Sequence, residues 1–231
     1  MPNVLITGCS RGLGLEWSRQ LAEDGWRVYA TCRYPHEAHE LAALAGRLPG
    51  LSVHRLDVTD AADIRALRWE LEDEPLDLLL NNAALYLDKD AAMLGSVRYD
   101  EWLRTFEVNT LGAVRLCEAF LPNLRRGGRP LAVAVSSHMG SIADIATADS
   151  LYYRSSKAAL NAAMRGLAAV LGEEGVGVLI VHPGWVRTRM GGPMGRLTTA
   201  QSVRGMRALV ENFGPAQHGR FFRYDGTELP W

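Results

Sequence analysis

The stretch TGCSRGLG, residues 7–14, decides the fold, because it joins an apolar run at residues 3–7 to an amphipathic run at residues 13–24. Glycine stands at the second, sixth and eighth positions of this stretch. Glycine permits a tight turn and lets the backbone approach a pyrophosphate closely. A helix that begins directly after such a loop presents free N–H groups and partial positive charge to phosphates. The stretch therefore predicts a strand, a phosphate-binding turn and a helix.

Short apolar runs alternate with longer amphipathic runs along the rest of the chain. Most of the apolar runs are nearly continuous in Val, Leu and Ile, which indicates strands buried on both faces of a parallel sheet. The predicted strands are residues 3–7, 27–31, 51–56, 76–82, 130–136, 176–182 and 219–224. The predicted helices are residues 13–24, 61–73, 100–121, 152–171 and 199–212. We therefore predict an α/β fold with one doubly wound, Rossmann-type parallel sheet of about seven strands and helices on both faces.

Composition narrows the class of protein. The chain has 231 residues, and no linker or repeat interrupts it, so we predict a single domain over residues 1–231. A net charge of −1 predicts no binding to nucleic acid or to an anionic membrane. Three scattered cysteines, Cys9, Cys32 and Cys117, fit a reducing compartment and form no metal-binding pattern with the histidines. No signal-like or membrane-length segment stands out, so we expect a cytoplasmic protein. The scattered cysteines and histidines lead us to expect no metal site.

The stretch SLYYRSSKAAL, residues 150–160, places Tyr152 and Tyr153 just upstream of Lys157. On a helix, residues i and i+4 are offset by about 40°, whereas residues i and i+5 diverge by about 140°. Lys157 is therefore the neighbour of Tyr153, and we expect Tyr152 to pack or to line the substrate side. A free tyrosine has a pKa of about 10, and a nearby ammonium favours the phenolate and lowers that pKa. A tyrosine tuned in this way is suited to give a proton to a carbonyl under reduction.

These motifs resemble those of the short-chain dehydrogenases/reductases, whose pattern is TGxxxGxG, then Asn-Asn-Ala-Gly after the fourth strand, then Ser, Tyr-xxx-Lys and Asn in the active site. The chain carries, in this order, TGCSRGLG at residues 7–14, NNAA at 81–84, Asn109 in EVNTLGA, the serine pair at 136–137, Tyr153 with Lys157, and HPGWVRT at 182–188. One departure is Ala84, which stands where the family usually has glycine, and we expect little consequence. With SSHMGSI and DGTELPW, the chain looks most like the C-factor and carbonyl-reductase-like branch.

The resemblance implies a catalytic set and a cofactor-binding set. The catalytic set is Asn109, Ser137, Tyr153 and Lys157. The cofactor-binding set is Gly8, Ser10, Arg11, Gly12, Leu13, Gly14, Arg33, Asp57, Val58, Asn82, Ala83, Tyr153, Lys157, Pro183, Gly184, Val186 and Thr188. In the family mechanism that this implies, Tyr153 transfers the proton, Ser137 binds the substrate oxygen, and Asn109 anchors the lysine's proton relay through water. Asp57 matches the position that contacts the adenine amino group, and Thr188 matches the position that binds the nicotinamide carboxamide.

The end of the second predicted strand indicates which cofactor binds. In dinucleotide folds an acidic residue there binds the ribose 2′-hydroxyl, whereas a nearby arginine accommodates a 2′-phosphate. This chain has Cys32 at the acidic position, Arg33 directly after it, and Arg11 in the glycine loop on the same side. Two guanidiniums suit the geometry of a phosphate. We therefore predict NADP in preference to NAD.

Three assignments have alternatives. Ser136 competes with Ser137, because the gap from Ser137 to Tyr153 is longer than in common members of the family. Asp57 is also placed to cap the helix predicted after it, for which Thr59 and Asp60 are candidate caps too. Ser137, His138 and Asp144 supply the residue types of a hydrolase triad. The hydrolase interpretation is disfavoured, since the chain lacks a G-x-S-x-G elbow and adjacent Ser and His side chains rarely point at each other; His138 is expected to line the cleft or to face solvent.

The segment after Thr188, residues 189–203, is short and rich in glycine, and we expect it to cover the substrate. A short cover indicates an open cleft. We therefore predict an NADP(H)-dependent oxidoreductase that transfers a hydride between the nicotinamide and a small carbonyl or alcohol. The alternative is a non-catalytic NAD(P)-binding signalling protein of the C-factor type.

The two longest predicted helices, 100–121 and 152–171, resemble surfaces that members of the family often pair in dimers. They carry the apolar residues Leu111, Val114, Leu160 and Met164. On this basis we predict a homodimer.

Overall fold

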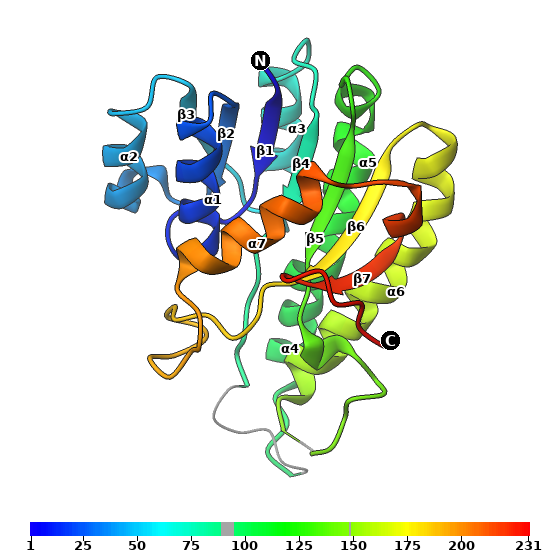
Figure 1. Cartoon of the computed structure of the whole chain (residues 1–231). Helices are drawn as coiled ribbons and strands as arrows, with labels where there is room; N and C mark the ends of the chain where they lie inside the picture. The colour runs from blue at the N-terminus through cyan, green and yellow to red at the C-terminus, as the bar shows by residue number, and fades with distance from the viewer. Residues whose placement is uncertain (89–94, 148) are drawn as a thin grey trace.

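The computed structural model describes residues 1–88, 95–147 and 149–231. Seven parallel strands form one sheet in the order β3-β2-β1-β4-β5-β6-β7 (Figure 1). The strands are β1 (Asn3–Ile6), β2 (Arg27–Cys32), β3 (Leu51–Arg55), β4 (Leu78–Asn81), β5 (Leu131–Val135), β6 (Gly177–His182) and β7 (Arg220–Arg223). Each lies within one of the seven predicted ranges, apart from a one-residue extension at Cys32. The predicted doubly wound sheet is confirmed.

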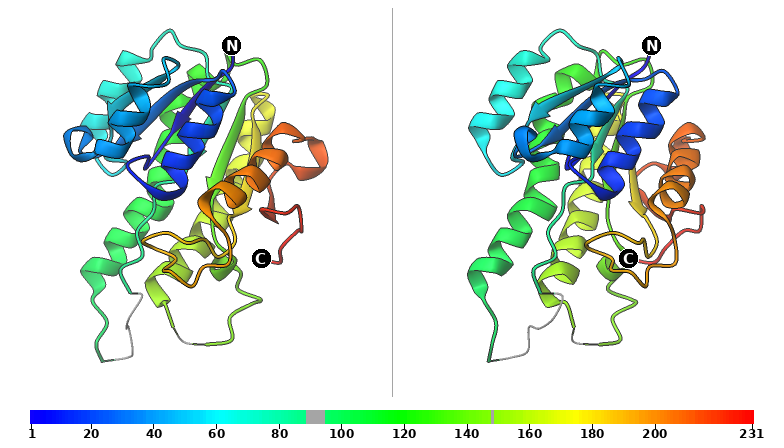
Figure 2. Two further views of the ribbon diagram at one scale, coloured as in Figure 1. Left: turned by 60° about the vertical axis from the view of Figure 1, so that its left-hand side comes forward. Right: turned by 90° about the vertical axis from the view of Figure 1, so that its left-hand side faces the viewer.

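Helices cover both faces of this sheet, as the turned views of Figure 2 show. They are α1 (Gly12–Glu23), α2 (His39–Ala45), α3 (Ala61–Glu70), α4 (Tyr99–Phe106), α5 (Gly112–Leu124), α6 (Leu151–Glu173) and α7 (Thr199–Glu211). Side chains alternate along a strand, so Leu5 joins the core under α3, α5 and α6, while Val4 and Ile6 join the core under α1, α2 and α7. Two buried cores therefore hold most of the strands, which explains the nearly continuous apolar runs, whereas the edge strand β3 joins only the second core through Leu51.

The strand order reverses between β1 and β4. Ile6 pairs with Leu80 of β4 on one side and with Ala30 of β2 on the other. The glycine loop after β1 and the NNAA stretch after β4 therefore leave the same edge of the sheet side by side. Doubly wound sheets bind ligands outside the carboxyl ends of their strands at such a reversal.

The helix predicted over residues 100–121 differs from the structure in two ways. A π-helical turn, η2 (Glu107–Leu111), separates α4 from α5. The helix also continues past Pro122 to Leu124. Tertiary contacts stabilise this last turn, since Leu124 is fully buried and the Asn123 amide donates to the carbonyl oxygens of Leu71 and Glu74 at 2.6 and 2.8 Å.

The apolar residues on which the predicted dimer surface rests differ in their solvent exposure. Leu160 and Met164 are buried in the core of the chain itself, whereas Leu111 is 42% exposed. Within the described ranges, no helix combines the length and apolar character needed to cross a bilayer. The same ranges hold no cluster of three or more His, Cys, Asp or Glu residues placed to bind a metal ion.

Candidate active site

The glycine loop is locked against the end of β4. The Thr7 hydroxyl accepts hydrogen bonds from the backbone N–H groups of Asn82 and Ala83, at 3.0 and 2.9 Å. The Asn82 amide donates back to the Thr7 carbonyl oxygen at 2.8 Å. A Cβ on Gly14 would lie 2.3 Å from the Gly8 carbonyl oxygen and 2.7 Å from the Asn82 amide nitrogen, so only glycine fits there.

Helix α1 begins in this loop with its N-terminus uncapped. Its N-cap residue, Arg11, makes no side-chain capping bond, and the first turn contains no acidic residue. The first N–H groups of the helix and its partial positive charge are therefore open to an anionic ligand. A dinucleotide pyrophosphate fits this end of the helix.

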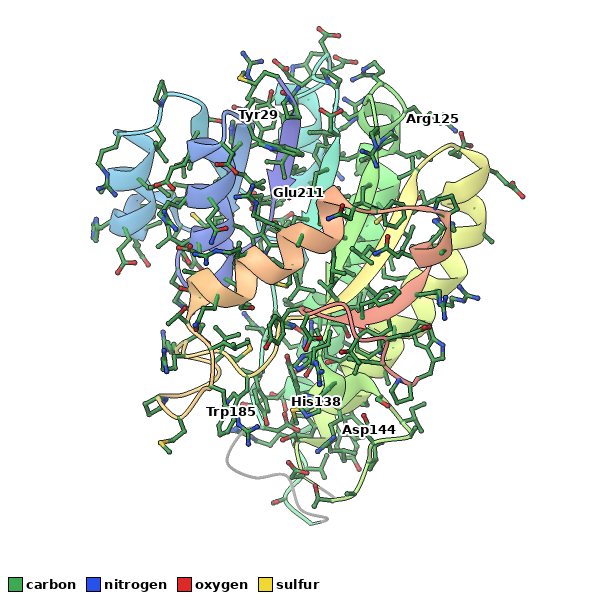
Figure 3. All side chains as sticks on the ribbon, in the orientation of Figure 1. Tyr29, Arg125, His138, Asp144, Trp185 and Glu211 are labelled. Atoms are coloured by element: carbon green, nitrogen blue, oxygen red, sulfur yellow. The ribbon has the colours of Figure 1, made fainter. Side chains whose placement is uncertain are left out.

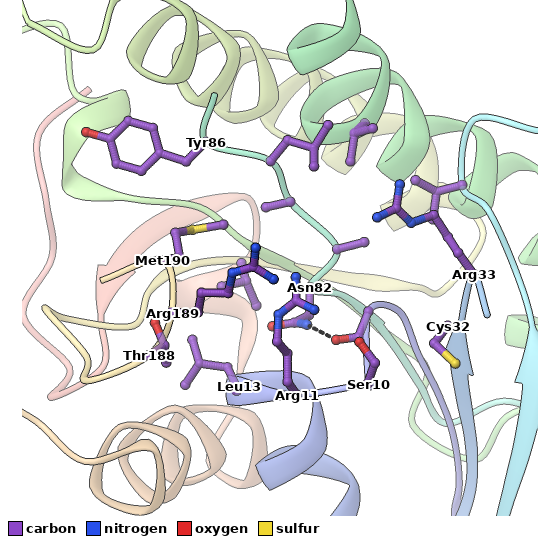
Figure 4. Close-up of a pocket in the computed structure, with 18 of the residues that line it drawn as sticks. Ser10, Arg11, Leu13, Cys32, Arg33, Asn82, Tyr86, Thr188, Arg189 and Met190 are labelled. Atoms are coloured by element: carbon purple, nitrogen blue, oxygen red, sulfur yellow. Dashed lines mark hydrogen bonds between the residues drawn. The ribbon is translucent and has the colours of Figure 1, made fainter. Parts of the chain in front are cut away.

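A cavity of about 1200 Å³ opens at this edge of the sheet (Figure 4). Most of the predicted cofactor-binding residues line it, namely Gly8, Ser10, Arg11, Gly12, Leu13, Arg33, Asp57, Val58, Asn82, Ala83, Tyr153, Lys157, Pro183 and Thr188. Gly14, Gly184 and Val186 do not line it. Gly14 and Gly184 lie where a side chain would collide with their neighbours, and Val186 is buried.

One end of the cavity, beside the glycine loop and the end of β2, carries two arginines alongside the carboxylates of Glu37, Glu40 and Asp57. Arg11 and Arg33 both line it, and Figure 4 shows both side chains reaching into it. Within the described part of the chain, neither guanidinium forms an ion pair with a carboxylate. Cys32, at the end of β2, brings no charge to this end of the cavity. The pair is free to receive a doubly charged phosphate.

Asp57 does not cap the helix that follows it. Its carboxylate accepts hydrogen bonds from the Thr59 N–H at 2.9 Å and from the Thr59 hydroxyl at 2.7 Å. Helix α3 is capped instead by Asp60, which accepts from the Ala62 N–H at 2.7 Å. The Asp57 side chain therefore shapes a turn in the wall of the cavity.

Tyr153 and Lys157 project from the start of α6 into the cavity, and both are buried. The Lys157 ammonium donates to the Val135 carbonyl oxygen at 2.7 Å and lies 5.8 Å from the centre of the Tyr153 ring. Burial lowers the pKa of Lys157 to about 7. Burial also raises the pKa of Tyr153, and a hydrogen bond with the Ser137 hydroxyl offsets part of that rise.

This result differs from the sequence-based expectation of a lowered tyrosine pKa. The spacing of Tyr153 and Lys157 indicated neighbours but carried no information about burial. Desolvation disfavours the charged form of both groups, so it opposes the phenolate and the ammonium alike. In this structure Tyr153 is therefore protonated at neutral pH, which is the form that donates a proton.

The two serines after β5 have different surroundings. The Ser136 hydroxyl donates to the Asn161 side-chain oxygen at 2.6 Å, and both residues are buried. The Ser137 hydroxyl accepts from the Met139 N–H at 3.2 Å. Ser136 lines the cavity but its hydroxyl is held in a structural contact with α6, whereas the Ser137 hydroxyl lowers the pKa of Tyr153.

His138 does not form a triad with its neighbour. Its ring packs edge-on against His182, with 4.8 Å between ring centres. The Ser137 hydroxyl accepts from the Met139 backbone N–H instead. Figure 3 labels His138 and Asp144 on the segment that follows β5. These contacts give no support to a hydrolase.

Asn109 lies in the π-helical turn and clamps the chain after β4. Its side-chain oxygen accepts from the Leu85 N–H at 2.7 Å, and its amide donates to the Leu85 carbonyl oxygen at 2.8 Å. The amide also donates to the Ser156 hydroxyl at 2.9 Å. A small cavity of about 10 Å³, close to the volume that one water molecule needs, is lined by Asn109, Lys157 and Asn81 among others.

Tyr152 packs rather than facing the cavity. It is 2% exposed, and its ring stacks on Trp102 with 5.3 Å between centres. Its hydroxyl accepts from the Arg98 N–H at 2.5 Å. These contacts fix the start of α6 against α4.

The chain after β6 forms the other wall of the cavity. Gly184 has a φ of 80°, and a Cβ there would lie 2.6 Å from a methyl carbon of Leu197. The Thr188 hydroxyl accepts from the Gly191 N–H at 2.9 Å and lines the cavity. Of the predicted covering segment, residues 189–198 form a loop, whereas residues 199–203 already belong to α7 and contribute Ser202 and Val203 to the buried interior.

Three residues that the sequence analysis did not single out contribute to this site. Arg189 reaches into the cavity, as Figure 4 shows. The buried Asp88 carboxylate accepts from the Tyr152 and Tyr153 N–H groups at 2.6 and 3.3 Å, which caps α6. Tyr86 stacks on Tyr153. Only Arg189, a cation in the predicted cover, left a signal in the sequence.

The family model for short chain dehydrogenases matches residues 2–196. The C-signal of Myxococcus xanthus is 42% identical over 168 residues, which make up 73% of this chain and all of that protein. The carbonyl reductase Sniffer of D. melanogaster superposes with a TM-score of 0.93 at 31% identity, over the whole of both chains. The NADPH-bound carbonyl reductase from chicken fatty liver also has a TM-score of 0.93, at 32% identity over all of this chain and 99% of that one.

Proposed function

Because the chain belongs to the short-chain dehydrogenase/reductase family, an oxidoreductase family, we propose that it is an NADP(H)-dependent reductase of small carbonyl compounds. In this proposal a hydride passes between the nicotinamide and the carbonyl carbon, and Tyr153 gives the proton to the carbonyl oxygen. The observation that carries the proposal is the buried pair of Tyr153 and Lys157, which lines one cavity together with the open N-terminal end of α1.

The residues of the cavity fit NADP. The uncapped start of α1 would hold the pyrophosphate, and Gly14 keeps that approach clear. Among the residues that the structure describes, Arg11 and Arg33 form no ion pair with a carboxylate. They would hold the 2′-phosphate, and Cys32 brings no charge to repel it. Thr188 would hold the carboxamide at the nicotinamide end. When bound, the cofactor supplies the hydride.

The protein's own groups supply the proton. Burial keeps the Tyr153 phenol protonated, and the Ser137 hydroxyl would bond that phenol and orient the carbonyl oxygen. The Lys157 ammonium, with a pKa of about 7, can exchange a proton at neutral pH. Asn109 and Lys157 share the small cavity through which a water would return the proton.

Support for NADPH also comes from relatives. The chicken carbonyl reductase and a carbonyl reductase from Pseudomonas aeruginosa are described with NADPH and NADP bound. We propose the same preference here, together with a cytoplasmic location and a homodimer. The experiment is NADPH oxidation with a panel of small aldehydes and ketones, by the wild type and by Tyr153→Phe. The proposal requires turnover by the wild type and its loss in the variant.

The similarity to the Myxococcus xanthus C-signal favours a second candidate function, a signalling protein that binds NAD(P) without turning it over. Such a protein needs the glycine loop but not the Tyr153 phenol. A biological activity that survives Tyr153→Phe and requires only NADP binding would favour this candidate over the reductase.

A further inference from the structure

We propose that Tyr86 is a positioning residue for proton transfer, and that its ring holds the ring of Tyr153 in place and shields it from water. This inference rests on the proposed reductase function. Tyr86 belongs to the segment after β4, outside the motifs that indicated the active site. Figure 4 shows it at one end of the cavity, which it lines.

The two tyrosine rings are stacked. Their centres lie 4.3 Å apart with an angle of 22° between planes, which is close contact over the face of the ring. Tyr153 is 7% exposed. The Tyr86 ring therefore covers one face of Tyr153, which would otherwise border the cavity.

Tyr86 is itself held at both ends. Its hydroxyl and the Ser150 hydroxyl form a hydrogen bond of 2.5 Å. Ser150 precedes α6 with a φ of 56°, so its position is tied to the start of the helix that carries Tyr153. On the other side, Asn109 clamps the backbone of Leu85 with two hydrogen bonds of 2.7 and 2.8 Å.

These contacts link the predicted catalytic residues to one another. Asn109 fixes Leu85, the next residue is Tyr86, and the Tyr86 ring stacks on Tyr153. A proton transfer requires the donor oxygen to stay within hydrogen-bond reach of its acceptor. A tyrosine ring that is free to rotate or tilt about its χ angles spends less time in that geometry, so the stack raises the fraction of productive orientations.

The stack also affects the acid–base behaviour of Tyr153. Burial, to which the Tyr86 ring contributes, raises the pKa of the Tyr153 phenol, and the Tyr86 phenol adds a smaller rise. The ionisable groups that face Tyr153 within the described residues are Lys157, Tyr86 and, at its backbone N–H, Asp88. Removing the Tyr86 ring admits water to Tyr153, which lowers its pKa.

The test compares Tyr86→Phe, which keeps the stack, with Tyr86→Leu, which removes it. Tyr99→Leu is the matched control, because Tyr99 is 69% exposed on α4 and does not line the cavity. In Tyr86→Leu we expect kcat to fall about tenfold, the size that one lost aromatic pair supports, with the Kd for NADPH unchanged. Tyr99→Leu should keep kcat within about threefold of the wild type. Tyr86→Phe keeps the ring but loses the bond to Ser150, so its kcat should lie between those of the wild type and Tyr86→Leu.

Two results would overturn the inference. One is an unchanged kcat in Tyr86→Leu, and the other is a parallel loss of NADPH binding and kcat in both Tyr86 variants, which would indicate a structural role. Failure of the proposed function would look different, because the wild type itself would reduce no carbonyl. In that case crystal structures of the wild type and Tyr86→Leu still show whether the Tyr153 ring keeps its position, and an unmoved ring would overturn the inference.

Discussion

Replacing Lys157 by methionine should stabilise the protein while abolishing reductase activity. The lysine side chain is 1% exposed, and burial lowers its pKa from 10.5 to about 7. The unfolded chain therefore binds a proton between pH 7 and pH 10.5 that the folded chain does not. Stability rises with pH wherever the unfolded state holds more protons, so this lysine makes the wild type more stable as the pH rises through that window.

The size of the effect follows from the two pKa values. The full difference between the pKa of Lys157 in the unfolded and in the folded chain corresponds to about 5 kcal/mol in the free energy of unfolding. Between about pH 7 and about pH 9, the lysine should add about 2 kcal/mol to the free energy of unfolding of the wild type. Tyr153 stays protonated across this range, because its pKa is raised. Loss of the Lys157 bond to Val135 costs the variant the same amount at either pH.

The assay is urea unfolding of the wild type and of Lys157→Met at both pH values. The advantage of the variant at the lower pH should shrink by about 2 kcal/mol at the higher pH. A stability difference that is the same at both pH values would show that Lys157 does not titrate at a lower pH in the folded protein than in the unfolded chain. A direct check is available, because the chain has only two lysines, Lys89 and Lys157. NMR titration of isotope-labelled lysine side chains, assigned with Lys89→Arg, should show one that titrates near neutral pH.

Three further predictions concern other parts of the site. The double variant Arg11→Ala/Arg33→Ala should bind NADPH at least tenfold more weakly than the wild type, with NADH binding within about threefold of the wild type. Titration of tryptophan fluorescence measures both affinities, and an equal loss for both cofactors would contradict the assignment of the two arginines to the 2′-phosphate. Ser137→Ala should lower kcat. Ser136→Ala should mainly lower the free energy of unfolding, by about 1–3 kcal/mol, because it leaves the buried amide oxygen of Asn161 unpaired. The reverse pattern in kinetics and urea unfolding would exchange the roles of the two serines. Gly14→Ala should abolish NADPH binding in the same titration, because its Cβ would lie 2.3 Å from a backbone oxygen; wild-type binding would contradict this.

Much of the fold could be predicted from the sequence, because its signals are local. A strand buried on both faces must be continuously apolar, and the central strands β1, β4, β5 and β6 come close to that pattern. The edge strands β3 and β7 include polar or charged residues. The prediction of one continuous helix over residues 100–121 was wrong in detail, because a π-helical turn has the same amino-acid composition as an ordinary helix. Its cause is tertiary: the turn places Asn109 against the backbone of Leu85, a residue from another part of the chain.

The candidate site was predictable where spacing along one element decides the geometry. The offset of four residues brings Tyr153 and Lys157 together on α6. Contacts between separate loops leave no such signal, so the roles of Tyr86 and Asp88 became visible only in the structure. The prediction of a lowered pKa for Tyr153 was wrong for a similar reason: the burial that raises this pKa is a property of the whole fold, which local spacing does not reveal.

The most direct test of the proposed function is a single turnover with NADPH bound before a small aldehyde or ketone is added. It should be run on the wild type and on Tyr153→Phe, after equal NADPH binding by both has been established through energy transfer from the six tryptophans. The account predicts rapid NADPH oxidation in the wild type and a loss of several orders of magnitude in the variant. Equal rates in both proteins, or no binding of NADPH by the wild type, would contradict it.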